Sequence, residues 1–412
     1  MEEKDDSCEV PNLESIKEEE KPTRTVFIDY VSGKPVDERV LEAMQPYHRE
    51  IFGNPSSLHI FGDPPVEAME DARKKVADLI GAKDPKEIVF TSGATESNNL
   101  ALKGVAFRNQ KKGTHIIISA LEHISIINIA KDLEKFGFKT TQVGVDKYGI
   151  VEFDKLEKQI KPETLLISIN YANNEIGTIE PVKEISKMAH DHNVYLHMDA
   201  VAAEGQIPID VQKDGVDLLT LSSNDIYGPR GMGALYIKNG VMIEPIIQGG
   251  GQERGLRSGT EDIPSIVGMG KAAEIAKKEM KKDSTRIQKM RDRIISTVLD
   301  TIDKSYLDGH PTQRLPNNAH FRFDYVEGEA ILLSLNMRGI AVSTGSACAA
   351  KRLEASHVLL SLGLLKEETH GSLELTLGKY NTEEDVDYVL EALPPVIERL
   401  RKLSPLTPKN EK

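Results

Sequence analysis

The stretch Asp217-Leu-Leu-Thr-Leu-Ser-Ser-Asn-Asp-Ile-Tyr-Gly-Pro-Arg-Gly-Met-Gly-Ala-Leu-Tyr-Ile237 predicts a strand, a short polar turn and a second strand. Apolar residues fill both ends of the stretch, as in buried strands. Glycine and proline interrupt its middle, as they do in turns, at Gly228, Pro229, Gly231 and Gly233. The polar run Ser222-Ser223-Asn224-Asp225 therefore lies where the first strand ends.

Apolar runs alternate with helical patterns on both sides of this stretch, from about residue 36 to about residue 280. The strand-like runs are Glu87–Phe90, His115–Ser119, Leu165–Ile169, Val194–Met198 and Leu218–Leu221. Such alternation is typical of a mostly parallel sheet covered by helices on both faces. Ligands bind such sheets at the carboxyl ends of the strands, so we expect the functional site there.

A different pattern begins near Ile287, where apolar residues repeat at helical spacing as far as Ile302 and predict one long amphipathic helix. Beyond this helix, strand-like runs at 317–324, 340–342 and 372–377 combine with helical runs at 328–336 and 383–402. We therefore predict an α/β protein with a large domain over residues 36–285. A smaller α+β domain is formed by residues 24–35 and 286–406, between a disordered acidic tail (1–23) and a polar tail (407–412).

Composition narrows the class of protein. The 412 residues are enough for two or three domains with a large core. Lys and Arg total 52 against 65 Asp and Glu, and the formal net charge of −13 speaks against a nucleic-acid binder. No apolar run approaches the roughly 20 residues that span a bilayer, and the acidic start Met1–Asp6 does not resemble a signal peptide. With two cysteines, no disulfide framework is expected, so we predict a cytoplasmic protein.

The opening stretch resembles the Schiff-base segment of the NifS/IscS cysteine desulfurases, pyridoxal-phosphate (PLP) enzymes of fold type I in the class V aminotransferase group. Further motifs follow in family order between about Phe27 and Leu406. They are Tyr30–Pro35, Phe52–Ser57, Thr91–Asn99, Glu122-His123, Asn173–Gly177, His197–Asp199, Gly249–Thr260 and Ser343–Cys348. The resemblance implies a PLP-dependent transferase fold and conversion of L-cysteine to L-alanine with transfer of the sulfur.

The resemblance also assigns cofactor-binding residues. Ala94 and Thr95 lie in the phosphate loop, His123 stacks on the ring, Asn174 bonds the ring hydroxyl and Asp199 holds the pyridine nitrogen protonated. The other two are Ser222 and Thr260, of which Thr260 reaches the phosphate site of the partner subunit in a homodimer. A glycine turn that feeds a helix N-terminus does offer N–H groups to a phosphate. Without the resemblance, however, these motifs would more often be ordinary strand–helix junctions and caps.

Four departures from the family pattern fall on catalytic functions. Asp225 replaces the Schiff-base lysine, and Asn224 replaces a histidine that contacts the phosphate. Ala202 stands for a glutamine that bonds the ring hydroxyl, and Glu374 stands for the arginine that binds the substrate carboxylate. A carboxylate cannot form an imine, and Glu374 reverses the charge of the clamp. We therefore expect PLP-dependent desulfuration to be impaired or lost, and covalent PLP to be absent from position 225.

No other lysine is an obvious substitute for the missing one, although Arg230 or Lys103 could approach a phosphate without forming an imine. The loop with the family's persulfide cysteine is nevertheless retained at Gly345-Ser-Ala-Cys348. A thiolate at Cys348 can carry a persulfide or ligate iron. A single cysteine is more often an inert apolar filler, and the motif context is what weakens that interpretation.

These observations favour a cysteine-desulfurase-like homodimer of iron–sulfur cluster assembly that docks an IscU-type scaffold. It would offer Cys348 as persulfide carrier or as a metal ligand in a shared 2Fe–2S cluster. One alternative is an active PLP-dependent cysteine desulfurase that binds PLP without a covalent link. A second alternative is a purely structural binding partner with no role in sulfur transfer.

Overall fold

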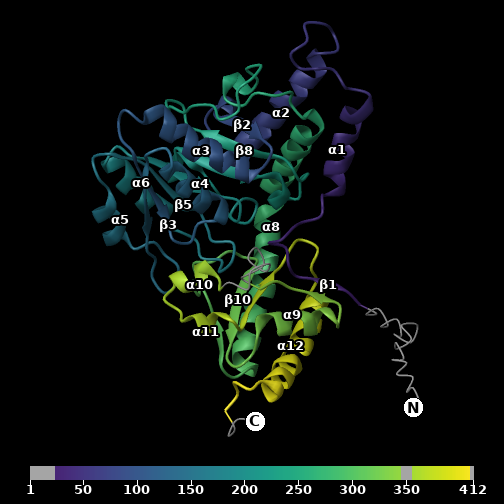
Figure 1. Cartoon of the computed structure of the whole chain (residues 1–412). Helices are drawn as coiled ribbons and strands as arrows, with labels where there is room; N and C mark the ends of the chain where they lie inside the picture. Colours follow the sequence, from purple (N-terminus) through teal and green to yellow (C-terminus); the bar gives the residue numbers. More distant parts are fainter. Residues whose placement is uncertain (1–23, 345–354, 409–412) are drawn as a thin grey trace, which may run out of the picture.

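The structure is a computed structural model that describes residues 24–344 and 355–408 (Figure 1). Its largest element is a sheet of seven strands in the order β2-β8-β7-β6-β5-β3-β4. The strands are β2 (Ile88–Thr91), β3 (His115–Ser119), β4 (Lys139–Val143), β5 (Thr164–Asn170), β6 (Tyr195–Asp199), β7 (Leu218–Ser222) and β8 (Gly233–Ile237). Only β8 runs antiparallel to its neighbours within this sheet. The predicted mostly parallel sheet is thus confirmed.

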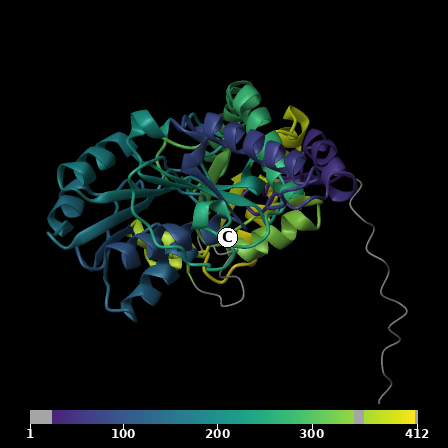
Figure 2. The same ribbon diagram turned by 90° about the horizontal axis from the view of Figure 1, so that it is seen from above.

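Helices lie on both faces of this sheet (Figure 2). They are α1 (Glu38–Arg49), α2 (Asp63–Ile80), α3 (Ala94–Asn109), α4 (Ile124–Glu134), α5 (Phe153–Gln159), α6 (Val182–Asp191) and α7 (Val211–Asp214). Strand β3 shows why continuous apolar runs form these strands. Ile116 and Ile118 belong to the hydrophobic cluster on one face, and Ile117 belongs to the cluster on the other. Both faces of the strand are buried, so its three central positions are all apolar.

The stretch Asp217–Ile237 forms β7, a 3₁₀ turn (Ser223–Ile226) and β8, as predicted. The two strands pair antiparallel, with Ser222 opposite Gly233. A side chain at Gly233 could not be accommodated, because its Cβ would lie 2.7 Å from backbone atoms of Gly93. The turn is therefore held directly against the glycine loop that precedes α3.

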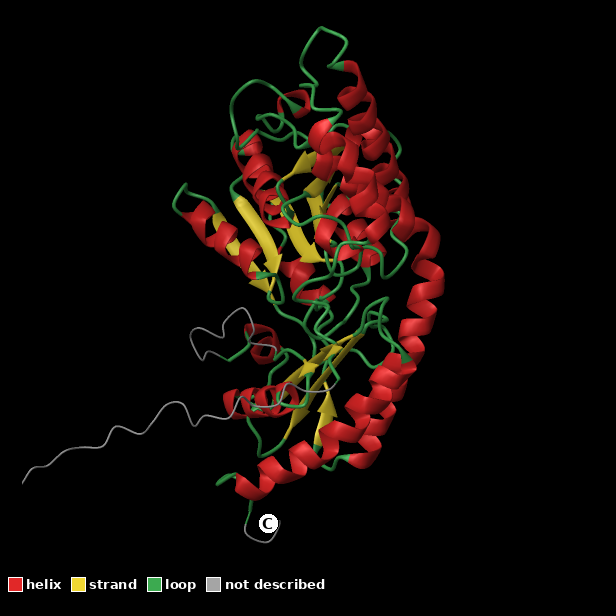
Figure 3. Ribbon diagram, turned by 90° about the vertical axis from the view of Figure 1, so that its right-hand side faces the viewer, coloured by secondary structure: helices red, strands yellow, loops and turns green. Residues whose placement is uncertain are grey.

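Helix α8 (Ile263–Thr301) runs for 39 residues from the large sheet to a second group of strands (Figure 3). There β9 (Ser305–Leu307), β10 (Asn318–Phe323) and β12 (Ser372–Thr376) form an antiparallel sheet in the order β12-β10-β9, and β1 (Val26–Phe27) pairs in parallel with β11 (Ile340–Ala341). The accompanying helices are α9 (Gly328–Asn336), α10 (His357–Ser361), α11 (Lys366–Thr369) and α12 (Glu383–Leu403). In the described part of the chain, no helix is long and apolar enough to cross a membrane.

The core residues of α8 fall into two groups. Those up to Ala276 pack in the core of the large sheet, and those from Ile287 onward pack in the core of the small sheet. The predicted domain boundary between residues 285 and 286 therefore lies inside this helix. That the two parts fold as separate units stays a prediction.

Candidate active site

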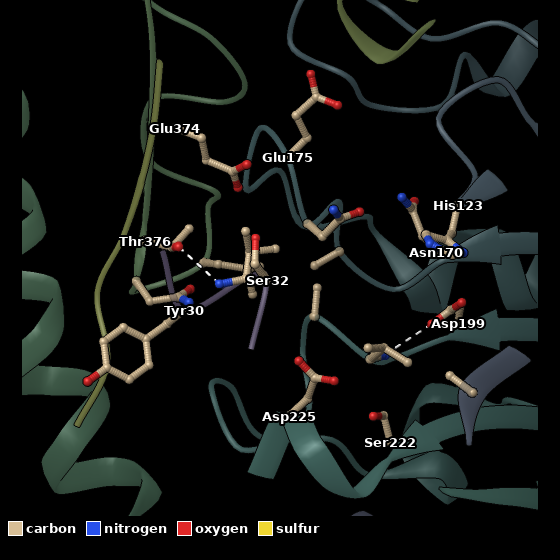
Figure 4. A pocket seen from close by; sticks show the side chains of 18 of the residues that line it. Tyr30, Ser32, His123, Asn170, Glu175, Asp199, Ser222, Asp225, Glu374 and Thr376 are labelled. Atoms are coloured by element: carbon tan, nitrogen blue, oxygen red, sulfur yellow. Dashed lines mark hydrogen bonds between the residues drawn. The ribbon is translucent and has the colours of Figure 1, made fainter. Parts of the chain in front are cut away.

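A cavity of about 300 Å³ lies at the carboxyl ends of the central strands of the large sheet. Asn170, Asp199 and Ser222 end the neighbouring strands β5, β6 and β7, and all three line the cavity. Glu374 and Thr376 of β12 face them from the small sheet (Figure 4). The site therefore lies at the carboxyl ends of the parallel strands, as expected for such a sheet. The second sheet forms one of its walls.

Nine of the residues named from the sequence meet in this cavity. They are Ala94, Thr95, His123, Asn174, Asp199, Ala202, Ser222, Asp225 and Glu374. Cys348 lies outside the described residues. Ser343 and Thr344, which precede its loop in the chain, line the cavity. The structure thus brings together most of the predicted site, while the role of each residue stays a prediction.

Two predicted residues do not line the cavity. Asn224 follows Ser223 in the 3₁₀ turn, and its Oδ1 accepts a hydrogen bond from Arg230 Nε at 3.4 Å. Thr260 lies at a separate hollow beside Ser92 and Arg257. Since the resemblance assigns Thr260 to the partner subunit's phosphate site, a position outside its own cavity is what that role requires.

The phosphate end of the cavity is built by the start of α3. Ala94 begins this helix, and Gly93 before it adopts φ 136° and supplies no side-chain cap. The first backbone N–H groups of α3 and the positive end of its dipole are therefore available to an anion beside Ala94 and Thr95. This geometry suits a phosphate.

Asp199 is buried at the end of β6, and its burial raises the pKa of the carboxyl. Asn98 Nδ2 donates to Asp199 Oδ2 at 2.9 Å, and the Val201 N–H donates to Oδ1 at 3.1 Å. Two amide oxygens that belong to cavity residues, Asn98 Oδ1 and Asn170 Oδ1, are buried without a partner among the described residues. Buried polar atoms are nearly always satisfied, so these oxygens indicate room for a polar ligand.

Two glutamate residues of the described chain line the cavity, Glu374 from β12 of the small sheet and Glu175 from the segment between β5 and α6. Glu374 is buried, and Asn318 Nδ2 donates to its Oε1 at 3.2 Å. Glu175 accepts from Ser356 Oγ at 2.6 Å, and its burial raises the pKa of the carboxyl to about 7. Among the described residues that line the cavity there is no arginine. The carboxylate clamp of the family thus has no counterpart in the described wall.

Lys34 is a cavity residue that the sequence interpretation missed. Its side chain is 5% exposed, and its Nζ donates to the backbone oxygen of Asp225 at 2.6 Å and lies 3.5 Å from Asp225 Oδ1. The sequence offers no obvious substitute for the missing lysine, yet the structure places Lys34 beside Asp225. Lys103 instead pairs with Asp132 at 2.8 Å and does not line the cavity. The sequence does contain one indication of this residue, because Lys34 lies within the family motif Tyr30–Pro35.

The described cavity residues are suited to bind PLP, but not to link it covalently at position 225. The start of α3 suits its phosphate, Asp199 suits a protonated ring nitrogen, and two cavity residues carry unpartnered amide oxygens. A Schiff base at position 225 does not suit them, because Asp225 has no amine. In the described part of the chain, no group of three or more His, Cys, Asp or Glu side chains is arranged to hold a metal ion.

Comparison with known proteins identifies the family of the chain. The family model "Aminotransferase class-V" matches residues 26–389. The chain is 58% identical to "Cysteine desulfurase IscS 1" of Archaeoglobus fulgidus over 380 residues, covering 92% of this chain and 99% of the relative. It is 51% identical to "Cysteine desulfurase IscS" of Methanosarcina thermophila over 403 residues, with 98% of each covered.

A solved structure named "NIFS-LIKE PROTEIN" superposes with a TM-score of 0.85 at 38% identity, covering 92% of this chain and all of the other. The matches extend over both sheets and the cavity between them. The chain therefore belongs to the class V aminotransferase family, whose cofactor is PLP, and within it to the cysteine desulfurases of the NifS/IscS type.

Proposed function

We propose that this protein acts in cytoplasmic iron–sulfur cluster assembly beside an IscU-type scaffold, with its own PLP-dependent desulfuration impaired or lost. The observation that carries the proposal is the presence of Asp225 and Glu374 in the same cavity. Asp225 removes the amine at the family's Schiff-base position, and Glu374 presents a carboxylate where the α-carboxylate of cysteine would bind. The two negative charges, on Glu374 and on the substrate carboxylate, would repel each other in this buried site.

The sulfur-handling part of the proposal rests on Cys348. Ser343 and Thr344, which precede it in the same motif, line the cavity. A thiolate at Cys348 can take the outer sulfur atom from a donor persulfide, which leaves as a thiolate, or it can ligate iron together with the scaffold in a shared 2Fe–2S cluster. Neither role needs the imine that Asp225 cannot form.

Cluster assembly on the scaffold is expected to fall when Cys348 is replaced by serine, because the hydroxyl retains the volume but neither carries persulfide nor binds iron well. The measurement is the cluster absorbance during reconstitution of an IscU-type scaffold with iron and sulfide. Cys8→Ser is the matched control, since it removes the other cysteine of the chain and should leave the rate unchanged. Equal rates for the wild type and Cys348→Ser would favour a purely structural partner.

An active PLP-dependent desulfurase is the second candidate, favoured by the retained phosphate end, Asp199 and the unpartnered Asn98 and Asn170 oxygens. The two candidates differ in the products that they release. An active enzyme given PLP and L-cysteine releases alanine in step with sulfide, whereas the proposed protein releases neither.

An apolar loop between α1 and α2 supports the homodimer. Leu58 is fully exposed, Ile60 is 78% exposed, and the rings of Phe52 and Phe61 stack with centroids 6.2 Å apart. The loop lies at the same end of the molecule as residues 249–260 (Figure 1). A second copy that covers this end would bury the loop and bring its Thr260 toward the neighbouring cavity.

Light scattering is therefore expected to give about twice the chain mass of 45.6 kDa, and Leu58→Asp should shift the protein toward the monomer. Leu58 makes little contact within its own chain, so the substitution should leave the fold intact. The control is Leu403→Asp at the end of α12, where a 73% exposed leucine lies at the opposite end of the molecule. A wild-type monomer at micromolar concentration would contradict the dimer.

A further inference from the structure

The cavity contains a lysine side chain, although Asp225 occupies the position at which the family carries its Schiff-base lysine. Among the described residues that line the cavity, Lys34 is the single lysine. It belongs to the segment between β1 and α1, 191 residues away from Asp225 along the chain. The amine therefore comes from a different element and lies directly against the β7–β8 turn.

The position of the amine coincides with the volume that a lysine at 225 would enter. Asp225 Oδ1 marks how far a side chain from this position reaches after its first two carbon atoms. Lys34 Nζ lies 3.5 Å from that oxygen. Asp225 and Lys34 thus place a carboxylate and an ammonium where the family places one lysine.

Lys34 is held in place from both sides. Before it, the Val31 N–H donates to Thr376 Oγ1 at 3.0 Å. After it, Pro35 restricts the backbone, and the Asp37 N–H donates to the oxygen of Tyr227 at 3.0 Å. The side chain is 5% exposed, so the amine is shielded from bulk water. Such anchoring is what a reactive side chain needs in order to meet a ligand in one geometry.

We propose that Lys34 is the amine of this cavity that captures an aldehyde, with PLP as the aldehyde that the phosphate end and Asp199 suit. The step is a condensation without redox change. The Lys34 ammonium gives a proton to the Asp225 carboxylate, and the free amine attacks the aldehyde carbon. The carbonyl oxygen leaves as water, taking the two protons that nitrogen loses, one of them through Asp225, and a C=N bond remains.

The assignment goes beyond the proposed function and does not depend on it, because it concerns neither the scaffold nor the release of sulfur. Capture at Lys34 leaves Glu374 in place, so it restores no clamp for the substrate carboxylate. It also gives Asp225 a role: its carboxylate accepts the proton that Lys34 must lose before it can attack.

The test is to incubate the purified full chain with one equivalent of PLP, reduce it with borohydride and locate the added pyridoxyl mass. A protease that cleaves after acidic residues suits this mapping, because Lys34 precedes Pro35 and resists trypsin. The expected result is one adduct on Lys34. Lys34→Arg, which keeps the positive charge beside Asp225, should lower the adduct at least 10-fold, while circular dichroism and the unfolding midpoint stay unchanged.

Two further variants separate the explanations. Lys103→Arg should leave the adduct unchanged, since Lys103 pairs with Asp132 outside the cavity. Asp225→Asn should slow formation of the adduct without moving it to another residue. The proposal is overturned if the wild type acquires no adduct, if the adduct maps to a different lysine, or if Lys34→Arg is labelled as fully as the wild type.

Discussion

Replacing Glu253 by alanine is expected to lower the free energy of unfolding by about 3–5 kcal/mol, because the buried Arg73 guanidinium loses its buried carboxylate partner. Arg73 and Glu253 are 1% and 2% exposed, and Arg73 NH2 and NH1 donate to the two carboxylate oxygens at 2.7 and 2.8 Å. Glu253 Oε2 also accepts from the Phe90 N–H at 2.9 Å. Urea unfolding at one fixed protein concentration measures the effect.

Glu70 supplies the matched control for this prediction. Its carboxylate reaches the same guanidinium at 3.0 Å, but its side chain is 51% exposed. Glu70→Ala should therefore cost no more than about 1 kcal/mol. The double variant Arg73→Met with Glu253→Leu removes both charges and should recover most of the loss. A small effect of Glu253→Ala, similar to that of Glu70→Ala, would show that Arg73 is not dependent on its buried partner.

Restoring both the lysine at position 225 and the arginine at position 374 is expected to give far more cysteine turnover than either substitution alone. With added PLP, Asp225→Lys supplies an amine at the family position, yet Glu374 still opposes the substrate carboxylate. Adding Glu374→Arg should raise the alanine produced by a further ~10–100-fold, since a hydrogen bond to a charged group contributes about 1.5–3 kcal/mol. Alanine release is the measurement, because sulfide alone can come from contaminants.

Asp225→Lys combined with Glu374→Gln is the control, since it removes the negative charge without adding a donor that matches a carboxylate. It should fall between the single and the double variant. A wild-type protein that releases alanine as fast as Asp225→Lys/Glu374→Arg would show that the desulfurase reaction has not been lost and would favour the active-enzyme alternative.

The parallel sheet could be predicted because its strands are buried on both faces and so read as continuous apolar runs. Strand β3 begins and ends where the sequence predicts it. Strand β4 escaped notice because it lies at the edge of the sheet and is mostly polar (Lys139-Thr-Thr-Gln-Val143). Strand β9 has three residues, too few for any periodicity to show.

Site residues could be predicted where a family motif falls at the end of a predicted strand. They could not be predicted where the site depends on a contact between segments that are distant in the sequence. Asp199 ends an apolar strand within a known motif, so its place at the cavity follows from local sequence. Lys34 meets Asp225 only in the folded chain, and no pattern near either residue indicates the pairing. Asn224 and Asp225 are adjacent, yet in a tight 3₁₀ turn neighbouring side chains diverge, and only Asp225 lines the cavity.

Helix α8 also has a mechanical consequence. At 1.5 Å per residue its 39 residues make a rod of about 58 Å that is embedded in both cores. Parting the two sheets like a hinge would break backbone hydrogen bonds in the middle of this rod. The opposite walls of the cavity, with Asp225 on one and Glu374 on the other, therefore keep a fixed spacing, and access for a ligand depends on side chains and loops at the rim.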